Sequence, residues 1–490
     1  MTSDRRTALL AQASSLHRAG RLDAAAQAYA RILHEWPDET GALTPFAAIA
    51  LARGEAEQAL ALVERALAAA PDEVIALSVQ GAALQRLGRL DAARESFERV
   101  LAQQPGHAES WNNRGVVLRQ DGRLDEALAS YDRALSLRPD YAAAHNNRGN
   151  VLQDLRRLDA ANESFDRAIA LRPQYAEAWW NKARLRILQG DYEEGWRLAE
   201  WRWRGPQRHY LRDFGRPLWL GDAPVAGRTV LVHAEQGQGD CIQFCRYAPM
   251  VAALGARVVL EVSAALVALI GTLDDRIAVI EQGRPLPPFD LHCPVMSLPH
   301  AFRTTVDTIP GEVPYLRADP ARRAAWQRRL GPRTRRRVGL AWSGSPDQAE
   351  DRRRSLPVRM LEPLFELPFE FHALQRDVRP GDADFLAGCA AVTRHDAELS
   401  DFAETAALAE EMDLVVSVCT SVAHLAGALA RPTWILLSFM PDYRWMLDRP
   451  DSPWYPTATL LRQRSFNDWA PVVAEARERL RSLAGPEGAG

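Results

Sequence analysis

The sequence predicts an α-solenoid of helical hairpins followed by an α/β region made of two lobes. Prolines and glycines recur at intervals of 34 residues from the start of the chain to about residue 203, a period that indicates stacked helical repeats. From Thr229 onward, short apolar segments alternate with helical stretches, which is typical of parallel sheets covered by helices on both faces. A stretch rich in Pro and Arg near residues 316–336 divides these segments into two groups.

The repeat period is carried by residues with distinct physical roles. The prolines expected to end the second helix of each hairpin are Pro37, Pro71, Pro105, Pro139 and Pro173. The turn between the two helices is expected at Gly20, Gly54, Gly88, Gly122 and Gly190, with Arg156 in the one gap. The small residues that let the helices cross closely are Ala25, Ala59, Ala93, Ala127 and Ala161. The aromatic residues expected to fill the space between hairpins are Tyr29, Phe97, Tyr131 and Phe165. The pattern resembles tetratricopeptide repeats, in nearly six units from about residue 6 to about residue 203.

Composition and charge exclude several classes of function. A formal charge of −3 over 490 residues provides no basic surface for a phosphate backbone, so nucleic acid is not expected as a partner. The chain shows no signal-type apolar run and no stretch of 18 apolar residues, which predicts a cytoplasmic protein without a transmembrane segment. The only lysine is Lys182, inside the repeats, which rules out a Walker-type phosphate loop and a pyridoxal enzyme.

The cysteines predict reduced thiols rather than a disulfide framework or a metal site. They are odd in number and fall in neither a CxxC nor a zinc-ribbon spacing. These residues are Cys241, Cys245, Cys293, Cys389 and Cys419. No metal ion is therefore expected.

The patterns divide the chain into four segments. Residues 1–203 form the solenoid, 204–228 a linker, 229–325 an N-terminal Rossmann-like lobe, and 326–490 a C-terminal Rossmann-like lobe that ends in a helix. The strands are predicted at 229–234, 256–262, 337–342, 369–374, 414–418 and 433–437. Open parallel sheets bind ligands at the carboxyl ends of their strands, so a site is expected where the two lobes face one cleft.

Asparagines occupy the sixth position of the last three repeats, on the helix that lines the concave face of such solenoids. They are Asn113, Asn147 and Asn181, in the runs WNNRG, HNNRG and WWNKA. A carboxamide donates and accepts hydrogen bonds at once, so a row of them would hold the backbone of a protein or peptide partner. This row resembles the asparagine ladder of eukaryotic O-linked N-acetylglucosamine transferases. The alternative is that each Asn satisfies a neighbouring carbonyl within the repeats.

The first lobe opens with an apolar strand, a glycine-containing loop and a helix, in the run TVLVHAEQGQGDCIQFCRY. Gly237 and Gly239 permit close approach of the backbone to a ligand, and Asp240 lies where the N-cap of the helix is expected. The spacing does not match the GxGxxG dinucleotide fingerprint, so NAD-dependent chemistry is not favoured. On spacing alone, helix capping is the ordinary role of Asp240.

The second lobe ends with a buried strand followed by a helix, in the run DLVVSVCTSVAHLAGALARPTWILLS. Thr420 and Ser421 lie at the start of that helix, and His424 lies one turn further on. Free backbone amides and flanking hydroxyls at a helix N-terminus suit a diphosphate. On residue type alone, His424 is equally consistent with a core histidine.

An ordered set of motifs resembles one known family. The motifs are EQGQGDCIQFCRY, FDLHCPVMSLP, GLAWSGSPDQAEDRRRS, FHALQ, DFAETAAL and SVCTSVAHLAGALARP. In that order, they resemble bacterial tetratricopeptide proteins whose C-terminal part is similar to family 9 glycosyltransferases, the heptosyltransferases. The resemblance covers residues 1–480 and implies a B-type glycosyltransferase fold, without metal or tightly bound cofactor, that uses a nucleotide-sugar as co-substrate.

The resemblance also implies residue roles. Asp240 matches the Gly-Asp whose carboxylate deprotonates the acceptor hydroxyl in an inverting transfer. Arg352 and Arg354 match basic positions that would neutralise the diphosphate, although DRRRS also fits an ordinary solvated cluster. The residues expected to complete the donor pocket are Gln375, Thr420, Ser421 and His424. The aromatic residues that would stack on a base or sugar, or instead anchor a loop, are Trp445 and Trp454.

One departure from the family keeps a second hypothesis open. Cys419 stands where heptosyltransferases carry an aspartate, and a thiol is a weak substitute for a carboxylate as acceptor. The leading hypothesis is a glycosyltransferase that moves a sugar to a hydroxyl of a protein or glycan recruited by the repeats. The alternative is a non-catalytic scaffold for protein-protein interaction that has kept a degenerate transferase domain.

Overall fold

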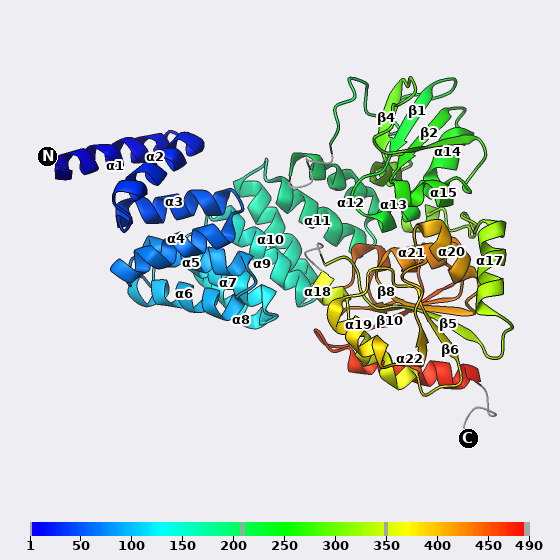
Figure 1. The fold of residues 1–490 in the computed structure, drawn as a ribbon. Helices are drawn as coiled ribbons and strands as arrows, with labels where there is room; N and C mark the ends of the chain where they lie inside the picture. Colours follow the sequence, from blue (N-terminus) through cyan, green and yellow to red (C-terminus); the bar gives the residue numbers. More distant parts are fainter. Residues whose placement is uncertain (1, 206–207, 209–210, 347–350, 485–490) are drawn as a thin grey trace. The chain divides into compact units, whose positions relative to one another are not determined.

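The computed structural model describes residues 2–205, 208, 211–346 and 351–484. The chain forms two compact units, Met1–Ala178 and Trp179–Gly490. The first unit is helical, and the second contains two parallel sheets with their covering helices (Figure 1). Parts of the predicted linker, of the GLAWSGSPDQAEDRRRS motif and of the C-terminal tail lie outside the described residues, at 206–207, 209–210, 347–350 and 485–490.

Helices of the first unit are joined in antiparallel pairs with the predicted period. They are α1 (Thr2–Arg18), α2 (Leu22–Glu35), α3 (Thr40–Ala52), α4 (Ala56–Ala69), α5 (Val74–Arg86), α6 (Leu90–Gln103), α7 (Ala108–Gln120), α8 (Leu124–Leu137), α9 (Ala142–Asp154) and α10 (Leu158–Leu171), and α11 (Ala176–Leu188) follows across the boundary between the units. The second helix of each pair ends two residues before the predicted proline, as α2 does before Pro37. Because proline disfavours helical backbone in the residue before it, the helix stops there.

The turn residues adopt the left-handed backbone that the pattern predicts. Gly20, Gly54 and Gly122 have φ of +70°, +88° and +81°. Arg156, which fills the gap in the glycine series, also has a positive φ, +58°. The turn geometry therefore persists where the sequence lacks glycine, at a cost of about 1 kcal/mol for a side chain in this region.

A second glycine series, which the sequence analysis did not identify, explains how the helices of a pair approach each other. A Cβ added to Gly115 of α7 would lie 2.7 Å from the ring of Tyr131 on α8. Gly81 and Gly149 meet Phe97 and Phe165 in the same way, at 2.7 Å and 2.5 Å. Phe97, Tyr131 and Phe165 therefore fill the space within their own pairs, where no side chain larger than hydrogen fits opposite them, and not only the space between hairpins that the sequence predicted.

The second unit begins with the remaining helices of the array and a four-stranded parallel sheet. Helix α12 (Tyr192–Ala199) and the short helix η1 (Glu200–Arg204) precede strands β1 (Thr229–His233), β2 (Arg257–Val262), β3 (Ile277–Glu281) and β4 (Leu291–Pro294). The strand order is β3-β2-β1-β4. The helices of this lobe are α13 (Gln238–Phe244), α14 (Ala248–Ala253), α15 (Val267–Ile270) and α16 (Leu298–Ala301).

A six-stranded parallel sheet forms the other lobe. Its strands are β5 (Arg337–Ala341), β6 (Glu370–Ala373), β7 (Val392–Thr393), β8 (Leu414–Val418), β9 (Thr433–Leu437) and β10 (Ala458–Arg462), in the order β10-β9-β8-β5-β6-β7. Its helices are α17 (Pro320–Leu330), α18 (Asp351–Arg354), α19 (Pro380–Ala387), α20 (Phe402–Glu410), α21 (Ser421–Ala428) and α22 (Ala470–Ala484). The parallel α/β organisation predicted after Thr229 is confirmed.

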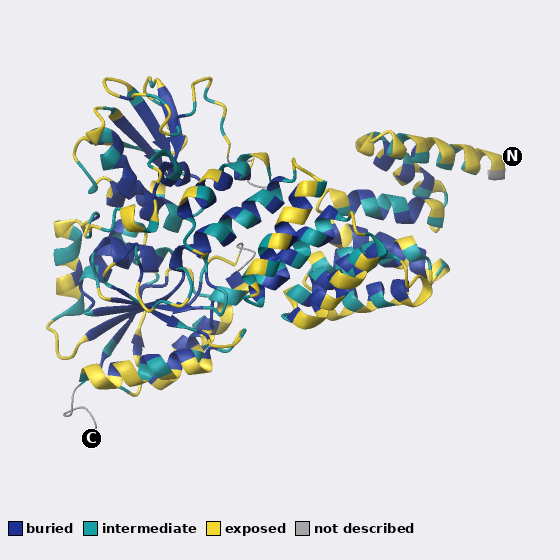
Figure 2. Cartoon of the chain, turned by 180° about the vertical axis from the view of Figure 1, so that it is seen from behind, coloured by how far each residue is buried: buried dark blue, intermediate teal, exposed yellow. Residues whose placement is uncertain are grey.

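The central strands of the larger sheet are buried on both faces, as Figure 2 shows by their dark colour. Every residue of β5, β8 and β9 is buried, because helices cover the sheet on each side. One face packs against α22, through Val472, Ala476 and Leu480. The core of this lobe is therefore a continuous apolar layer, and the polar site residues lie beyond it, after the ends of the strands.

The boundary between the compact units falls before the predicted end of the solenoid at residue 203. Trp196 of α12 packs edge-on against Phe244 of α13, with ring centroids 5.7 Å apart. Arg202 of η1 is fully buried and donates to both carboxylate oxygens of Glu235, at 2.8 and 3.0 Å. The last hairpin buries its apolar face against the first sheet lobe, so it belongs to the second unit.

No described helix is both long enough and apolar enough to cross a membrane.

A buried histidine pair joins β6 of the larger sheet to the segment that follows β7. Nδ1 of His372 and Nε2 of His395 are 3.1 Å apart, and the rings stack with centroids 5.4 Å apart. One ring must donate and the other accept, which requires an unprotonated nitrogen in the contact. Burial, together with the neighbouring histidine, lowers the pKa of His372 to about 4, and burial does the same for His395.

This pair should make the folded state sensitive to acid. In the unfolded chain a histidine has a pKa of about 6.5, so between about pH 6.5 and pH 4 the unfolded state binds more protons than the folded state. The unfolding free energy therefore decreases as the pH is lowered through this range. Each histidine contributes a slope of up to about 1.4 kcal/mol per pH unit. The double variant His372→Gln, His395→Gln should show a shallower loss of unfolding free energy from pH 7 to pH 5 in urea titrations. An unchanged slope would contradict a neutral pair.

Candidate functional site

The loop after β1 and the turn after β8 meet at the carboxyl ends of the two sheets. A Cβ added to Gly239 would lie 3.0 Å from Cδ2 of His424 and 3.4 Å from Cα of Ser421. The absence of a side chain therefore lets the first lobe approach the N-terminus of α21. Residues that the sequence analysis selected from two separate motifs are in direct contact here.

Asp240 lies inside α13 rather than at its cap, so the expectation that it is the N-cap residue is wrong. The N-cap is Gly237, whose extended backbone has φ −87° and ψ 160°. Asp240 is the third helical residue, and its Oδ2 accepts a hydrogen bond from the Gly237 amide at 2.9 Å. Glycine serves as an N-cap without a side-chain bond, and the acidic residue one turn later satisfies its free amide.

Arg444, which the sequence analysis did not select, forms an ion pair with Asp240. Its Nη2 donates to Oδ1 of Asp240, and its Nη1 donates to Oδ1 of Asp442 at 2.9 Å. The side chains of Arg444 and Asp240 are 9% and 15% exposed, so water screens this pair weakly. Burial disfavours the charge, yet Asp442 and Asp240 keep the pKa of Arg444 above its ordinary value. The candidate base is therefore engaged by a cation from the other lobe.

The turn between β8 and α21 contains the residue that departs from the family. Cys419 is buried; its Sγ accepts from Nε1 of Trp445 at 3.0 Å, and its carbonyl accepts from Nη1 of Arg354 at 3.2 Å. Burial raises the pKa of the thiol to about 11, so Cys419 is uncharged at neutral pH. Thr420 is the N-cap of α21 without a side-chain capping bond, and its hydroxyl lies 3.3 Å from that of Ser417.

His424 is a packed histidine. Its ring stacks on Trp445 with centroids 5.3 Å apart, and its Nδ1 lies 3.0 Å from the hydroxyl of Tyr455. Burial lowers its pKa well below 6.5, so the ring is neutral. Trp445 and Trp454 are both fully buried, and Nε1 of Trp454 donates to Tyr192 of α12 at 3.2 Å. Of the two alternatives for these tryptophans, the structure favours loop anchoring.

The arginines of α18 differ in their surroundings. Arg354 donates to Asp351 at 3.3 Å and to the Cys419 carbonyl, which places its guanidinium beside the α21 turn. Arg352 is exposed, as expected for a solvated cluster. The structure thus brings Arg354, and not Arg352, to the turn that holds Thr420 and Ser421.

The carboxamide of Gln375 forms its hydrogen bonds within its own lobe. Its Oε1 accepts from the amides of Trp342 and Ser343 at 3.3 Å each, and its Nε2 donates to the carbonyls of Ser343 and Asp377 at 3.0 and 3.2 Å. The carboxamide therefore fixes the loop after β5. Contact between Gln375 and a donor stays a prediction.

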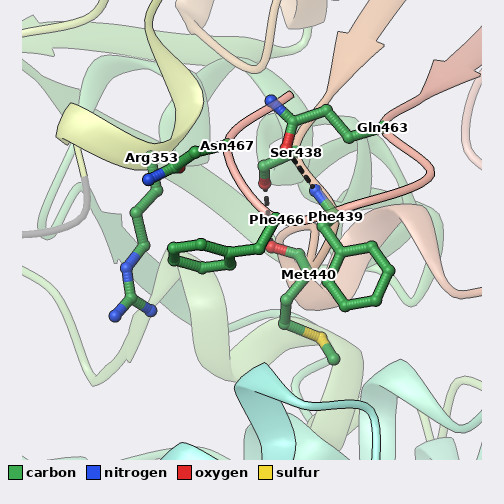
Figure 3. Close-up of a pocket in the computed structure, with 7 residues that line it drawn as sticks. All are labelled: Arg353, Ser438, Phe439, Met440, Gln463, Phe466 and Asn467. Carbon is green, nitrogen blue, oxygen red and sulfur yellow. Dashed lines mark hydrogen bonds between the residues drawn. The ribbon is translucent and has the colours of Figure 1, made fainter. Parts of the chain in front are cut away.

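A small pocket lies at the carboxyl ends of β9 and β10 (Figure 3). The residues that line it are Arg353, Ser438, Phe439, Met440, Gln463, Phe466 and Asn467. The guanidinium of Arg353 lies 5.6 Å from the centroid of the Phe466 ring. Nε2 of Gln463 is buried and has no hydrogen-bond partner among the described residues. The pocket thus offers an aromatic wall and an amide donor on the same lobe as Arg354.

The asparagines of the repeats are linked through neighbours that the sequence analysis missed. Asn113 accepts from Nδ2 of Asn112 at 3.1 Å, and Asn147 donates to Oδ1 of Asn112 at 2.9 Å. Asn146 donates to Glu177 at 3.4 Å. The repeated NN pair of α7 and α9 was the available signal, because both members recur at the repeat period. Asn181 lies on α11, in the second unit.

Across the described ranges, no three His, Cys, Asp or Glu side chains form a group that could hold a metal ion. All five cysteines are free.

Family models described as tetratricopeptide repeat match residues 16–83, 78–142 and 146–195. Together with the paired helices and their 34-residue period, these matches decide the nature of the first part of the chain. The N-terminal helices are tetratricopeptide repeats. Such repeats are typical modules for binding peptides and proteins.

A curated protein is similar to more of the chain than the repeats occupy. Protein FlbA of Caulobacter vibrioides (strain ATCC 19089 / CIP 103742 / CB 15) is 26% identical over 331 residues, which cover 62% of this chain and 54% of that protein. The chain therefore spans about half the length of this curated relative.

Solved structures that match part of the chain include the MamA protein, with 19% identity over 36% of this chain and 96% of that chain and a TM-score of 0.31. TTC0263, a thermophilic TPR protein of Thermus thermophilus, is 25% identical over 37% of this chain and 98% of that chain, with a TM-score of 0.33. YrrB, described as a TPR protein with an unusual peptide-binding site, is 22% identical over 35% of this chain and 88% of that chain, with a TM-score of 0.30.

Proposed function

We propose that the chain is a glycosyltransferase that moves a sugar from a nucleotide-sugar to a hydroxyl group, with the tetratricopeptide array recruiting a protein acceptor or partner. The observation that carries the proposal is the contact between the first turn of α13, which holds Gly239 and Asp240, and the N-terminus of α21, where Arg354 also lies. A candidate base and a candidate anion site thereby face each other at the carboxyl ends of two parallel sheets, the usual ligand position in such folds. The two lobes would be the Rossmann-like halves of a B-type glycosyltransferase.

The residues supply the parts that an inverting transfer needs. The carboxylate of Asp240 would take the proton of the acceptor hydroxyl as its oxygen bonds to the anomeric carbon. The bond from that carbon to the diphosphate oxygen breaks at the same time, and the electron pair leaves with the nucleoside diphosphate. Arg354 and the amides of α21 would stabilise the charge that develops on this leaving group. No metal ligand set is required by this scheme.

The alternative function is a protein-interaction scaffold with a degenerate transferase domain. Cys419 favours it, because the buried thiol is uncharged and occupies the position where a carboxylate is expected. In this case the tetratricopeptide array would act alone, through the linked asparagines of α7 and α9. Ligand binding by the C-terminal lobes distinguishes the two functions.

The first test is calorimetric titration of the full chain with a panel of nucleoside diphosphates and nucleotide-sugars. We expect selective binding that Arg354→Ala weakens by about tenfold, since a charge-assisted hydrogen bond contributes about 1.5–3 kcal/mol. Arg352→Ala is the matched control and should change the affinity less, because Arg352 is exposed. Equal affinity of both variants and the parent would place the arginine cluster outside the donor site. No binding across the panel would favour the scaffold.

A further inference from the structure

Arg444 connects elements that are far apart in the sequence. It follows β9 in the larger lobe, and its partner Asp240 lies 204 residues earlier, on α13 of the smaller lobe. Its guanidinium also lies over the rings of Tyr443 and Phe244, 4.6 and 5.8 Å from their centroids. The side chain of Arg444 is therefore enclosed by residues of both lobes, and it would stay buried if one of its two carboxylate partners moved away.

The guanidinium of Arg444 has a hydrogen-bond donor that its two carboxylate partners do not use. One guanidinium contacts two carboxylates, those of Asp240 and Asp442. Its Nε is buried and has no hydrogen-bond partner among the described residues. A guanidinium has five N–H donors in a planar fork, so Arg444 keeps an unused donor for a ligand that takes the place of one carboxylate.

An anion at the α21 turn would lie close to Arg444. Trp445, the next residue, donates to Sγ of Cys419, and Arg354 donates to the carbonyl of the same cysteine. The hydroxyl of Ser343, after the neighbouring strand β5, is buried and has no partner among the described residues. Arg354 and the residue next to Arg444 thus both contact the turn before a helix N-terminus that itself attracts negative charge.

We propose that Arg444 exchanges ligands when a nucleotide-sugar binds: the diphosphate displaces Asp240 from the guanidinium, and the carboxylate is freed for the acceptor hydroxyl. The inference rests on the proposed function, in which Asp240 is the base. It assigns Arg444 to the donor site and makes the availability of the base depend on the presence of the donor.

The exchange is favourable for electrostatic reasons. A diphosphate carries at least two negative charges, whereas Asp240 offers one, and the competition takes place where water screens weakly. Asp240 does not lose its position when released, because the Gly237 amide still holds its Oδ2 at 2.9 Å. A base that is paired with Arg444 until the donor arrives cannot take a proton from an acceptor that binds first.

The experiment measures the affinity of the full chain for inorganic pyrophosphate by calorimetry. Asp240→Asn should tighten pyrophosphate binding by about fivefold or more, because the neutral carboxamide no longer competes for Arg444. Arg444→Gln should weaken it by at least tenfold. The control is the pair Arg449 and Asp451 of the same loop, whose Nη2 and Oδ2 atoms are 2.6 Å apart and whose side chains are 26% and 62% exposed; Arg449→Gln and Asp451→Asn should leave the affinity unchanged.

A double variant separates ligand exchange from a general loss of negative charge. If Asp240 acts through Arg444, Asp240→Asn should not tighten pyrophosphate binding in the Arg444→Gln background. The effects of the two substitutions on the affinity should then be non-additive. If the gain persists in that background, Asp240 repels the anion independently and the exchange is refuted. If Arg444→Gln fails to fold, Arg444→Lys keeps the positive charge but not the planar set of donors. In that background, Asp240→Asn should tighten pyrophosphate binding less than it does in the parent.

The outcomes for this inference and for the proposed function are distinct. Pyrophosphate binding that depends on Arg354 but not on Asp240 or Arg444 would refute the exchange and leave the donor site intact. Exchange without turnover of any nucleotide-sugar would support the role of Arg444 and count against the transferase. Absence of pyrophosphate binding in every variant would refute the exchange.

Discussion

Asp240→Asn should lower the rate of sugar transfer by about 10²–10⁴-fold, the usual contribution of a positioned general base. The substitution keeps the shape of the side chain and leaves an oxygen to accept from the Gly237 amide, which lies 2.9 Å from the carboxylate. The protein should therefore stay folded and still bind the donor. Initial rates measured with a saturating nucleotide-sugar would show the loss of transfer, and an unchanged circular dichroism spectrum would show that the variant is folded.

The matched control for this prediction is Asp442→Asn. Asp442 also accepts from Arg444, at 2.9 Å, but is not the residue that matches the family's base. We expect a smaller loss of rate from this variant. Equal rates for Asp240→Asn and the parent would show that Asp240 only satisfies the start of α13 and pairs with Arg444.

Two truncations should differ sharply in stability. Removal of residues 1–178 leaves the second compact unit whole, so it should fold with a cooperative thermal transition. Removal of residues 1–203 also deletes the rest of α11, all of α12 and η1 up to its last residue, Arg204. It takes away Trp196, which is 2% exposed, and leaves the buried carboxylate of Glu235 without Arg202.

The expected cost of the longer truncation is large. Loss of a buried tryptophan costs about 3–5 kcal/mol, and breaking a buried ion pair costs about 3–5 kcal/mol. Together these losses are comparable to the whole stability of a typical domain. Scanning calorimetry of the two fragments should show a transition only for the shorter truncation. Equal stability would show that the last hairpin belongs to the solenoid alone.

The shorter truncation also gives a functional test of the repeats. The fragment from residue 179 keeps Asp240, Arg354 and Arg444, so it should bind the nucleotide-sugar as the full chain does. It should lose modification of a protein acceptor while slow donor hydrolysis persists, because the first unit has been removed. Undiminished modification of the protein would place acceptor recognition in the second unit.

The sequence predicted the repeats well because their determinants are local and periodic. Pro37 and its equivalents stop a helix, and Gly20 and its equivalents form a left-handed turn, whatever surrounds them. The strands of the sheet centre were predicted for a similar reason, since β5, β8 and β9 are continuous apolar runs. Strands β4 and β7 were missed because they have only four and two residues. Strands β3 and β10 are as long as β5 but are only partly buried and end in Glu281 and Arg462, so they lack a continuous buried apolar run.

The candidate site was predicted only in part. The sequence selected Asp240, Thr420, Ser421 and Arg354, and the structure brings their loops together through Gly239. It could not identify Arg444, because a single arginine in a loop carries no periodic signal. It also left two roles open for Trp445, and burial among His424, Cys419 and Tyr455 favours the anchoring role.

The sequence by itself determined the tetratricopeptide array and the parallel α/β character of the remainder, because both follow from backbone preferences and burial patterns within short segments. Only the tertiary structure decided which compact unit includes the last hairpin and which side chain forms an ion pair with Asp240. These features depend on contacts between residues up to 204 positions apart, as in the pair of Asp240 and Arg444. Such contacts arise from how the packed elements meet in space, and neither partner's local sequence encodes them.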